Sequence, residues 1–177
     1  MAKTRRRYYK RKTGKWSANI QEINNVIVPA DPGQWSGTTV LATNPVQNIL
    51  GVSNIYTVKN FDINFTIESG NALADANVLE AITAYIMFVP QGMNIDENYN
   101  VHHPEFILNY KYLGSPPGTT AGGAEVQQFQ PFRLRTRLSR RLQTGDSIVL
   151  FIKGTNSSSA QVNVFLSGLI RWWTKAN

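Results

Sequence analysis

The stretch Val58–Ile67, VKNFDINFTI, decides the fold class. Its side chains alternate: Phe61, Ile63, Phe65 and Ile67 fall on one side, and Val58, Asn60, Asp62, Asn64 and Thr66 on the other. Successive residues of a β-strand point to opposite faces of the sheet, so a period of two predicts a strand with one buried and one polar face.

Similar segments follow along the chain. They are rich in Val, Ile, Phe, Tyr and Thr and are bounded by Gly, Pro and Asn clusters. The predicted strands are Ile20–Val28, Ile55–Ile67, Ala81–Val89, Glu105–Leu113, Phe129–Leu138, Ser147–Lys153 and Val162–Trp173, with an eighth near Val40–Leu50. Only one segment, Ala72–Ala81, is predicted to form a helix. Long loops at Gln91–Pro104 and Gly114–Glu125 favour an all-β, eight-stranded antiparallel jelly-roll sandwich over a meander.

The first residues have a different character. The 177-residue chain has 18 Lys and Arg against 11 Asp and Glu, a net charge of +7. The first fifteen residues hold no acid and these cations: Lys3, Arg5, Arg6, Arg7, Lys10, Arg11, Lys12 and Lys15. The rest of the chain has one acid more than it has cations. We therefore expect a disordered basic arm over residues 1–16 and a jelly-roll domain over 17–177. This asymmetry indicates a polyanionic partner bound by the arm rather than by a basic face of the fold.

The composition of the arm suits nucleic acid. Closely spaced Lys and Arg side chains neutralise phosphates without reading sequence. Tyr8, Tyr9 and Trp16 offer aromatic rings on which unpaired bases stack, which favours single strands over duplex. The alternative is a nuclear localisation signal, because import receptors also bind Lys- and Arg-rich runs. The two uses are compatible.

A second basic stretch, FRLRTRLSRRL, spans Phe132–Leu142. On the predicted strand, Arg133, Arg135 and Arg137 project from one face while Leu134, Thr136 and Leu138 project from the other. Three arginines on one face repel each other unless an anion or solvent lies opposite. We predict a second nucleic-acid site here, or contact with an acidic patch of another subunit. A solvated sheet face is the alternative.

The C-terminal strand is apolar on both sides. Val162, Val164, Leu166, Ile170 and Trp172 share one face, and Phe165, Leu169 and Trp173 share the other. One buried face does not account for this pattern. We predict a subunit interface on the second face, at Phe165, Leu169, Arg171 and Trp173. The alternative is a loop of the same chain that folds over it.

Several classes of chemistry find no support. The chain has no cysteine, and therefore no disulfide and no thiolate metal site. His102 and His103 are adjacent, so on an extended chain they point apart, and we predict no metal site and no cofactor. No phosphate-cradling glycine loop or Gly-x-Ser-x-Gly elbow occurs, so we predict no enzyme. The longest apolar run, Ile82–Val89, is short of the ~20 residues of a membrane span, and no apolar run follows the basic start as in a signal peptide.

The sequence resembles the capsid proteins of small circular single-stranded DNA viruses that encode a replication-initiator protein, the circovirus-like group. The resemblance covers nearly the whole chain and rests on the order and spacing of several motifs. They are the basic N-terminus, TVKNFDI, YIMFVPQG (Tyr85–Gly92), HPEFI (His103–Ile107), YLGSP (Tyr112–Pro116), RLSRRLQTGDSIVLFIKG (Arg137–Gly154) and GLIRWWTKAN (Gly168–Asn177). The arm is shorter and less arginine-dominated than in the circoviruses proper.

The resemblance implies an eight-stranded jelly roll that forms an icosahedral T=1 shell of about sixty copies around circular single-stranded DNA. It implies a virion protein that is assembled in the host nucleus, with import receptors as further partners and no membrane. On heterologous expression, RNA can take the place of DNA. The arm would hang inside the shell and condense the genome.

Charge arithmetic indicates a second interior site. The arms of about sixty copies carry about 480 positive charges, whereas the coding sequence of this chain alone needs about 530 nucleotides. The remaining phosphates must meet body arginines, metal ions or polyamines. Two rival classes remain open: a cellular nucleic-acid-binding protein such as a ribosomal component with a basic extension, and a carbohydrate-binding jelly roll whose tryptophans line a groove.

Overall fold

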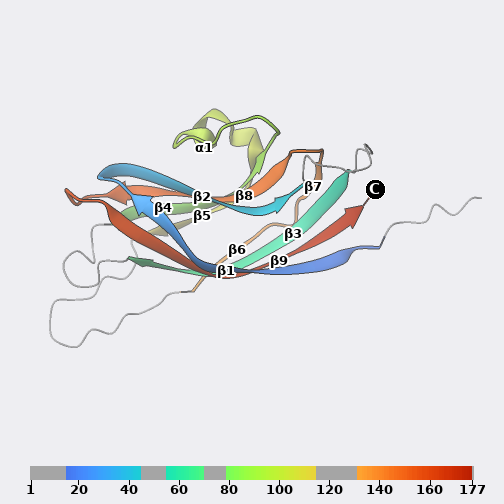
Figure 1. Cartoon of the computed structure of the whole chain (residues 1–177), viewed down its shortest axis with the longest axis horizontal. Helices are drawn as coiled ribbons and strands as arrows, with labels where there is room; N and C mark the ends of the chain where they lie inside the picture. Colours follow the sequence, from blue (N-terminus) through green and yellow to red (C-terminus); the bar gives the residue numbers. More distant parts are fainter. Residues whose placement is uncertain (1–14, 45–54, 70–78, 115–130, 177) are drawn as a thin grey trace, which may run out of the picture.

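The chain folds into two antiparallel β-sheets that lie face to face (Figure 1). The computed structural model describes residues 15–44, 55–69, 79–114 and 131–176. Sheet A contains β1 (Ser17–Ala30), β9 (Val162–Ala176), β3 (Tyr56–Ser69), β6 (Phe132–Arg135) and β7 (Ser139–Leu142). Sheet B contains β2 (Gly33–Thr43), β8 (Ser147–Asn156), β4 (Leu79–Val89) and β5 (Ile107–Gly114). A short helix α1 (Tyr99–His102) and a 3-10 turn η1 (Pro104–Phe106) precede β5.

The strand order is that of a jelly roll. In sheet A, β9 lies between β1 and β3, and β6 and β7 both pair with β3, so that together they occupy one strand position. In sheet B the order is β2-β8-β4-β5. The first strand of each sheet thus pairs with a strand from the end of the chain, as two wound Greek keys require. The predicted all-β jelly-roll sandwich is confirmed.

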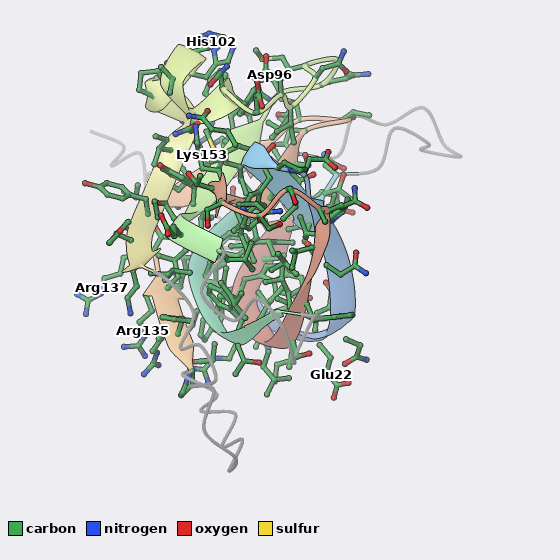
Figure 2. The ribbon with its side chains drawn as sticks, turned by 90° about the vertical axis from the view of Figure 1, so that its left-hand side faces the viewer. Glu22, Asp96, His102, Arg135, Arg137 and Lys153 are labelled. Atoms are coloured by element: carbon green, nitrogen blue, oxygen red, sulfur yellow. The ribbon has the colours of Figure 1, made fainter. Side chains whose placement is uncertain are left out.

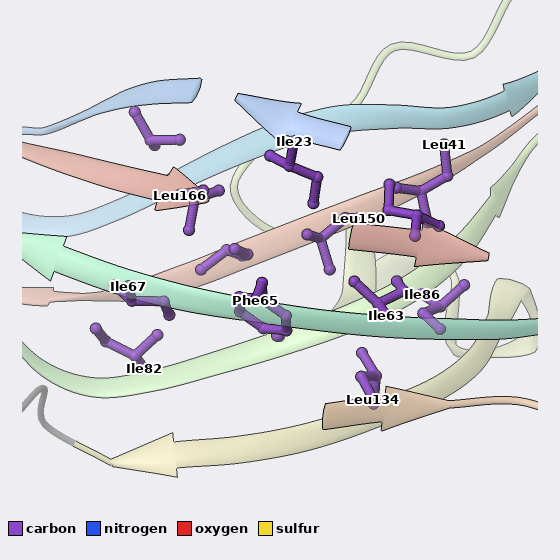
Figure 3. Packing of buried hydrophobic residues seen from close by; sticks show 14 of the residues in the cluster. Ile23, Leu41, Ile63, Phe65, Ile67, Ile82, Ile86, Leu134, Leu150 and Leu166 are labelled. Carbon is purple, nitrogen blue, oxygen red and sulfur yellow. The ribbon is translucent and has the colours of Figure 1, made fainter. Parts of the chain in front are cut away.

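The core lies between the sheets (Figure 3). Ile63 and Phe65 of β3 belong to the same buried cluster as Ile86 of β4 and Leu150 of β8, and all four are at most 2% exposed. The alternation in β3 therefore works as predicted over this part of the strand. Each side chain of this size contributes about 1.5–3 kcal/mol when it leaves water.

A β-bulge interrupts the alternation of β3. Two residues, Asn60 and Phe61, lie between the pairs that Lys59 and Asp62 make with β9, whereas β9 has only Trp172 there. Asn60 has a φ of 54°, a left-handed conformation that asparagine tolerates better than most residues. The extra residue turns Val58 into the core at 2% exposure. The prediction that Val58 shares the polar face is therefore wrong.

The predicted strand Phe129–Leu138 is broken. β6 ends at Arg135, and a separate strand, β7, begins at Ser139. The cause lies in Thr136: its backbone N–H donates to the Phe61 carbonyl in the bulge, and its hydroxyl accepts a hydrogen bond from Leu138 N–H at 3.1 Å. Leu138 is consequently 55% exposed rather than directed into the core. Phe129 lies outside the described residues.

Two other boundaries differ from the prediction. β2 spans Gly33–Thr43 instead of Val40–Leu50, because Trp35, in a stretch without clear alternation, is a buried anchor at 3% exposure. Residues 45–50 lie outside the described part of the chain. The predicted helix Ala72–Ala81 also lies mostly outside it, and its last residues belong to β4.

A second apolar cluster covers the outward side of sheet B. Segment 90–106, which includes α1, lies over this side (Figure 1) and contributes Tyr99 to a cluster with Met87, Val149 and Phe151. The Tyr99 hydroxyl donates to the Phe88 carbonyl at 3.3 Å, and burial raises its pKa to about 12. Strand β8 is thus buried on both sides. No helix among the described residues is long and apolar enough to cross a membrane.

Candidate nucleic-acid interface

The outward side of sheet A collects most of the positive charge of the folded body. Residues paired across neighbouring strands share a face, as do residues two apart on one strand. These rules place the following cations together: Lys59 of β3, Arg133 and Arg135 of β6, Arg141 of β7, and Arg171 and Lys175 of β9. Arg137 joins them from the β6–β7 loop, where it lines a pocket with Arg135 and Arg171. We call this surface the basic face.

The basic face holds seven of the ten Lys and Arg residues in 16–177. Three acids belong to the same stretch of sheet: Asp62, Glu22, which is paired with Leu169, and Glu68, whose backbone is paired with Phe165. The near-neutral total of the body therefore conceals a strongly uneven distribution. The inference from that total, that the fold has no basic face, is corrected.

Asp62 is the centre of the basic face. Its carboxylate accepts hydrogen bonds from Arg133 Nε at 2.9 Å and Nη2 at 2.7 Å, and from Arg135 Nη2 at 3.1 Å. Arg171 Nη2 lies 3.6 Å away. The hydrogen bonds from Arg133, and then those from Arg135, hold the pKa of Asp62 well below its ordinary value, although burial opposes this effect. Three guanidinium groups share one carboxylate, so two positive charges stay uncompensated.

The exposures show which partner faces solvent. The side chain of Asp62 is 9% exposed, whereas those of Arg133, Arg135 and Arg171 are 48%, 59% and 51% exposed. The acid is held beneath the arginines, which present their remaining N–H donors at the surface. A guanidinium has five such donors in a planar fork that matches phosphate geometry.

A pocket of about 330 Å³ opens beside this cluster. Its lining combines cations, one acid and aromatic rings: Asn60, Phe61, Asp62, Arg135, Thr136, Arg137, Arg171 and Trp173. Three positive charges thus line it against one negative charge. The bulge of β3 and the break between β6 and β7 supply most of its wall, so these two irregularities meet at the pocket.

Two tryptophans extend the basic face toward the N-terminus. The Arg171 guanidinium carbon lies 5.2 Å from the centre of the Trp173 ring, and Lys59 Nζ lies 3.8 Å from that of Trp16. Lys59 is also the cross-strand partner of Trp173. Trp16 directly precedes β1, so the arm joins the domain at the edge of the basic face.

The predicted arginines divide into two groups. Arg133 and Arg135 project outward from β6 as predicted, and Arg135 and Arg137 extend from the same side in Figure 2. Arg137, however, belongs to the loop and has no ion pair among the described residues. The arm residues Lys3, Arg5, Arg6, Arg7, Tyr8, Tyr9, Lys10, Arg11 and Lys12 lie outside the described residues, and Lys15 is exposed.

The predicted interface residues lie on the same face. Phe165, Leu169, Arg171 and Trp173 all point outward from β9, and Leu169 is 50% exposed. Ile20, opposite Arg171, is 71% exposed. No described segment of the chain covers this surface. Two separate predictions, nucleic-acid binding and subunit contact, therefore converge on one surface.

Several members of the basic face were missed in the sequence. Asp62 was read only as a polar position, and Lys59, Arg141 and Lys175 were not singled out. A signal was present in β9: Arg171, Trp173 and Lys175 occur at alternate positions opposite in parity to Leu166 and Ile170. The outward side of β9 is therefore cationic and aromatic at its C-terminal end, rather than simply apolar.

His102 and His103 lie on the side of the molecule that is opposite to the basic face (Figure 2). Figure 2 shows His102 and Asp96 at one end and Glu22 at the other. His102 Nδ1 lies 4.0 Å from Asp96, and His103 Nδ1 lies 3.3 Å from Glu105. The two rings thus contact different carboxylates. In the described ranges no three His, Asp or Glu side chains gather in a group that could hold a metal ion. That the chain binds no metal stays a prediction.

Comparison with known proteins gives distant likenesses. No protein-family model matches the chain, and no curated protein matches its sequence. A chain in a structure of infectious bursal disease virus, Gx strain, is similar with a TM-score of 0.41 and 10% identity over 91% of this chain and 33% of that one. A VP2 subviral particle of infectious bursal disease virus gives a TM-score of 0.25 and 11% identity over 90% of this chain and 42% of that one. This chain spans less than half the length of either, and its own strand order, not these likenesses, identifies the jelly roll.

Proposed function

We propose that this chain is the coat protein of a small virus and that its jelly rolls assemble into a closed shell with the basic face toward single-stranded nucleic acid. The observation that carries the proposal is the basic face itself: a jelly roll has gathered seven cations on one outer side, next to the root of a basic arm. The sequence resemblance to circovirus-like capsid proteins supports the finer reading.

In the finer reading, about sixty copies form a T=1 shell around circular single-stranded DNA. The protein is then a structural component of the virion and no enzyme. Assembly takes place in the host nucleus, which the arm reaches as an import signal. The domain would extend over residues 17–177 and the arm over residues 1–16.

The basic face also addresses the charge deficit. Its seven cations and three acidic positions leave four net charges in each copy. In about sixty copies, these add about 240 charges to the ~480 of the arms. The arms would condense the strand in the interior, and the basic face would hold the layer of nucleic acid next to the shell wall.

A cellular nucleic-acid-binding protein is the second candidate, and the basic face favours it too. Cellular proteins of this kind usually spread basic charge over the body, so a balanced body charge argues against this class. That argument is weak here, because the cations cluster on one side. The two candidates differ in assembly. A shell elutes from a sizing column far ahead of a subunit of 19.8 kDa, whereas a ribosomal component elutes as a monomer.

The structure does not support the carbohydrate-binding alternative, which required the tryptophans to line one groove. Trp35 is 3% exposed, and Trp172 stacks on Phe61 at the edge of the core, with 6.2 Å between ring centres and 8° between ring planes. Trp16 and Trp173 each lie beneath a cation. The four tryptophans therefore do not line one groove.

Electron microscopy of the purified, expressed full-length chain tests the proposal. We expect uniform particles that form without any other viral protein and contain nucleic acid. Monomers that bind nucleic acid would favour the second candidate. Monomers that bind none, or an amorphous aggregate, would refute the proposed function.

A further inference from the structure

The pocket beside Asp62 differs from the rest of the basic face because it joins a hollow of about 330 Å³ to both cations and an aromatic ring. Surface arginines alone attract any polyanion. A pocket lined by Arg135, Arg137, Arg171 and Trp173 adds a surface on which a planar group can stack. Nucleic acid offers phosphate and an unpaired base next to each other, which is the combination that this lining matches.

We propose that this pocket is a binding site for one nucleotide unit of an unpaired strand, and that Asp62 is the residue that positions its arginines. The phosphate binds among Arg135, Arg137 and Arg171, and the base stacks against Trp173 and the guanidinium beside it. This inference rests on the proposed function, because it assigns a ligand to part of the same face.

Asp62 explains why arginines of like charge stay close together without a bound anion. Its carboxylate holds Arg133 through two hydrogen bonds and Arg135 through one, and Arg171 lies within 3.6 Å. It neutralises only one of the charges that line the pocket, so the pocket stays attractive to phosphate. Arg137, which has no ion pair among the described residues, is the cation most available to the ligand.

The pocket should prefer single strands. In a duplex the bases are stacked and paired, so that their planar faces are not open to a protein ring without distortion. A duplex would therefore meet the arginines but not the ring of Trp173. The site reads no sequence, because each base has a planar face that stacks.

Salt titrations of the full-length protein test this inference, with a short oligothymidylate and a duplex with the same number of phosphates as probes. Arg137→Gln should reduce the slope of log affinity against log salt by about 0.7 for the single strand. Trp173→Leu should leave that slope unchanged and lower the single-strand affinity about tenfold, with no effect on the duplex. Lys153→Gln, which removes one charge near Glu97 on the far side, is the matched control and should change neither quantity.

Ultraviolet cross-linking of the oligothymidylate, mapped by mass spectrometry, separates the pocket from the arm. Cross-links at Trp173 together with the expected slopes support the inference. If cross-links occur only in residues 1–16 and both variants bind as the wild type does, the pocket is not a site, although the proposed function stands. If the wild type binds neither probe, both proposals fail. Arg137 is an exposed loop residue, so its variant keeps the test valid even if Trp173→Leu does not fold.

Discussion

The two outer faces of the sandwich differ in whether the chain itself covers them. The outward side of sheet B is covered by the protein's own segment 90–106, so that Met87 and Phe151 are fully buried there. The outward side of sheet A has no such cover among the described residues, and Leu169 is half exposed beside the arginines of the basic face. One face is therefore completed by folding, and the other is left for a partner.

This difference separates stability from binding. Substitutions on the outward side of sheet B should unfold the subunit, whereas those on the basic face should change what it binds.

Deletion of residues 1–15 isolates the basic face as the remaining cationic surface. Eight cations are lost, so the slope of log affinity against log salt for single-strand binding should fall in magnitude by about 6. Most of the packaged nucleic acid should also be lost. Thermal unfolding of the subunit should stay unchanged, because the segment has no Val, Leu or Ile side chain to bury. The absorbance ratio of nucleic acid to protein in purified particles measures the effect. An unchanged ratio would leave nuclear import as the better explanation of the arm.

Phe151→Ala on the buried outward side of sheet B should be the most destabilising substitution of this set. Phe151 is 0% exposed and packs beneath segment 90–106. Removing a buried phenylalanine costs about 3–5 kcal/mol in unfolding free energy. Urea denaturation measures it. A loss below about 1 kcal/mol would show that segment 90–106 does not complete the fold.

Asp62→Asn should lower the free energy of unfolding by about 2 kcal/mol near neutral pH. The reason is that it breaks ion pairs whose acid is buried but whose arginines are half exposed. The folded-state pKa of Asp62 lies below its unfolded value of about 3.9, so this stabilisation is complete above that value and is lost as the pH falls below it. The difference in urea midpoint between wild type and variant should therefore narrow steadily as the pH falls below about 3.9. A gap that stays constant with pH would show that charge is not its cause.

Leu169→Ala should have the smallest effect. Its side chain is half exposed, so the unfolding free energy should fall by less than about 1 kcal/mol. Particles should still form if the basic face contacts nucleic acid. Loss of particles with an unchanged melting temperature would instead assign this part of β9 to subunit contact, as the sequence alone had suggested.

The fold was predictable because the alternation in β3 and the apolar runs of β4, β8 and β9 are local patterns that the tertiary structure preserves. The break at Thr136 was not, because it depends on a hydrogen bond to Phe61 from a distant strand. Trp35 in β2 is likewise buried by tertiary contacts rather than by any periodicity of its own.

The candidate site was predictable only in part. Arg133 and Arg135 follow from alternation within one strand. Their convergence with Arg171 on Asp62 requires the register of three strands, which the sequence does not state. Net charge was the least informative quantity, because a sum over the body cannot show that seven of its ten cations lie on one side.

The bulge at Asn60 makes the number of residues in β3 a requirement for this surface. Deletion of one residue between Val58 and Asp62 would reverse the parity of one half of the strand relative to the other. Either Val58 would turn to solvent and Lys59 into the core, or Asp62 would leave its arginines. We expect the chain to tolerate substitution at position 60 by residues that accept a positive φ, but not a change in the number of residues there.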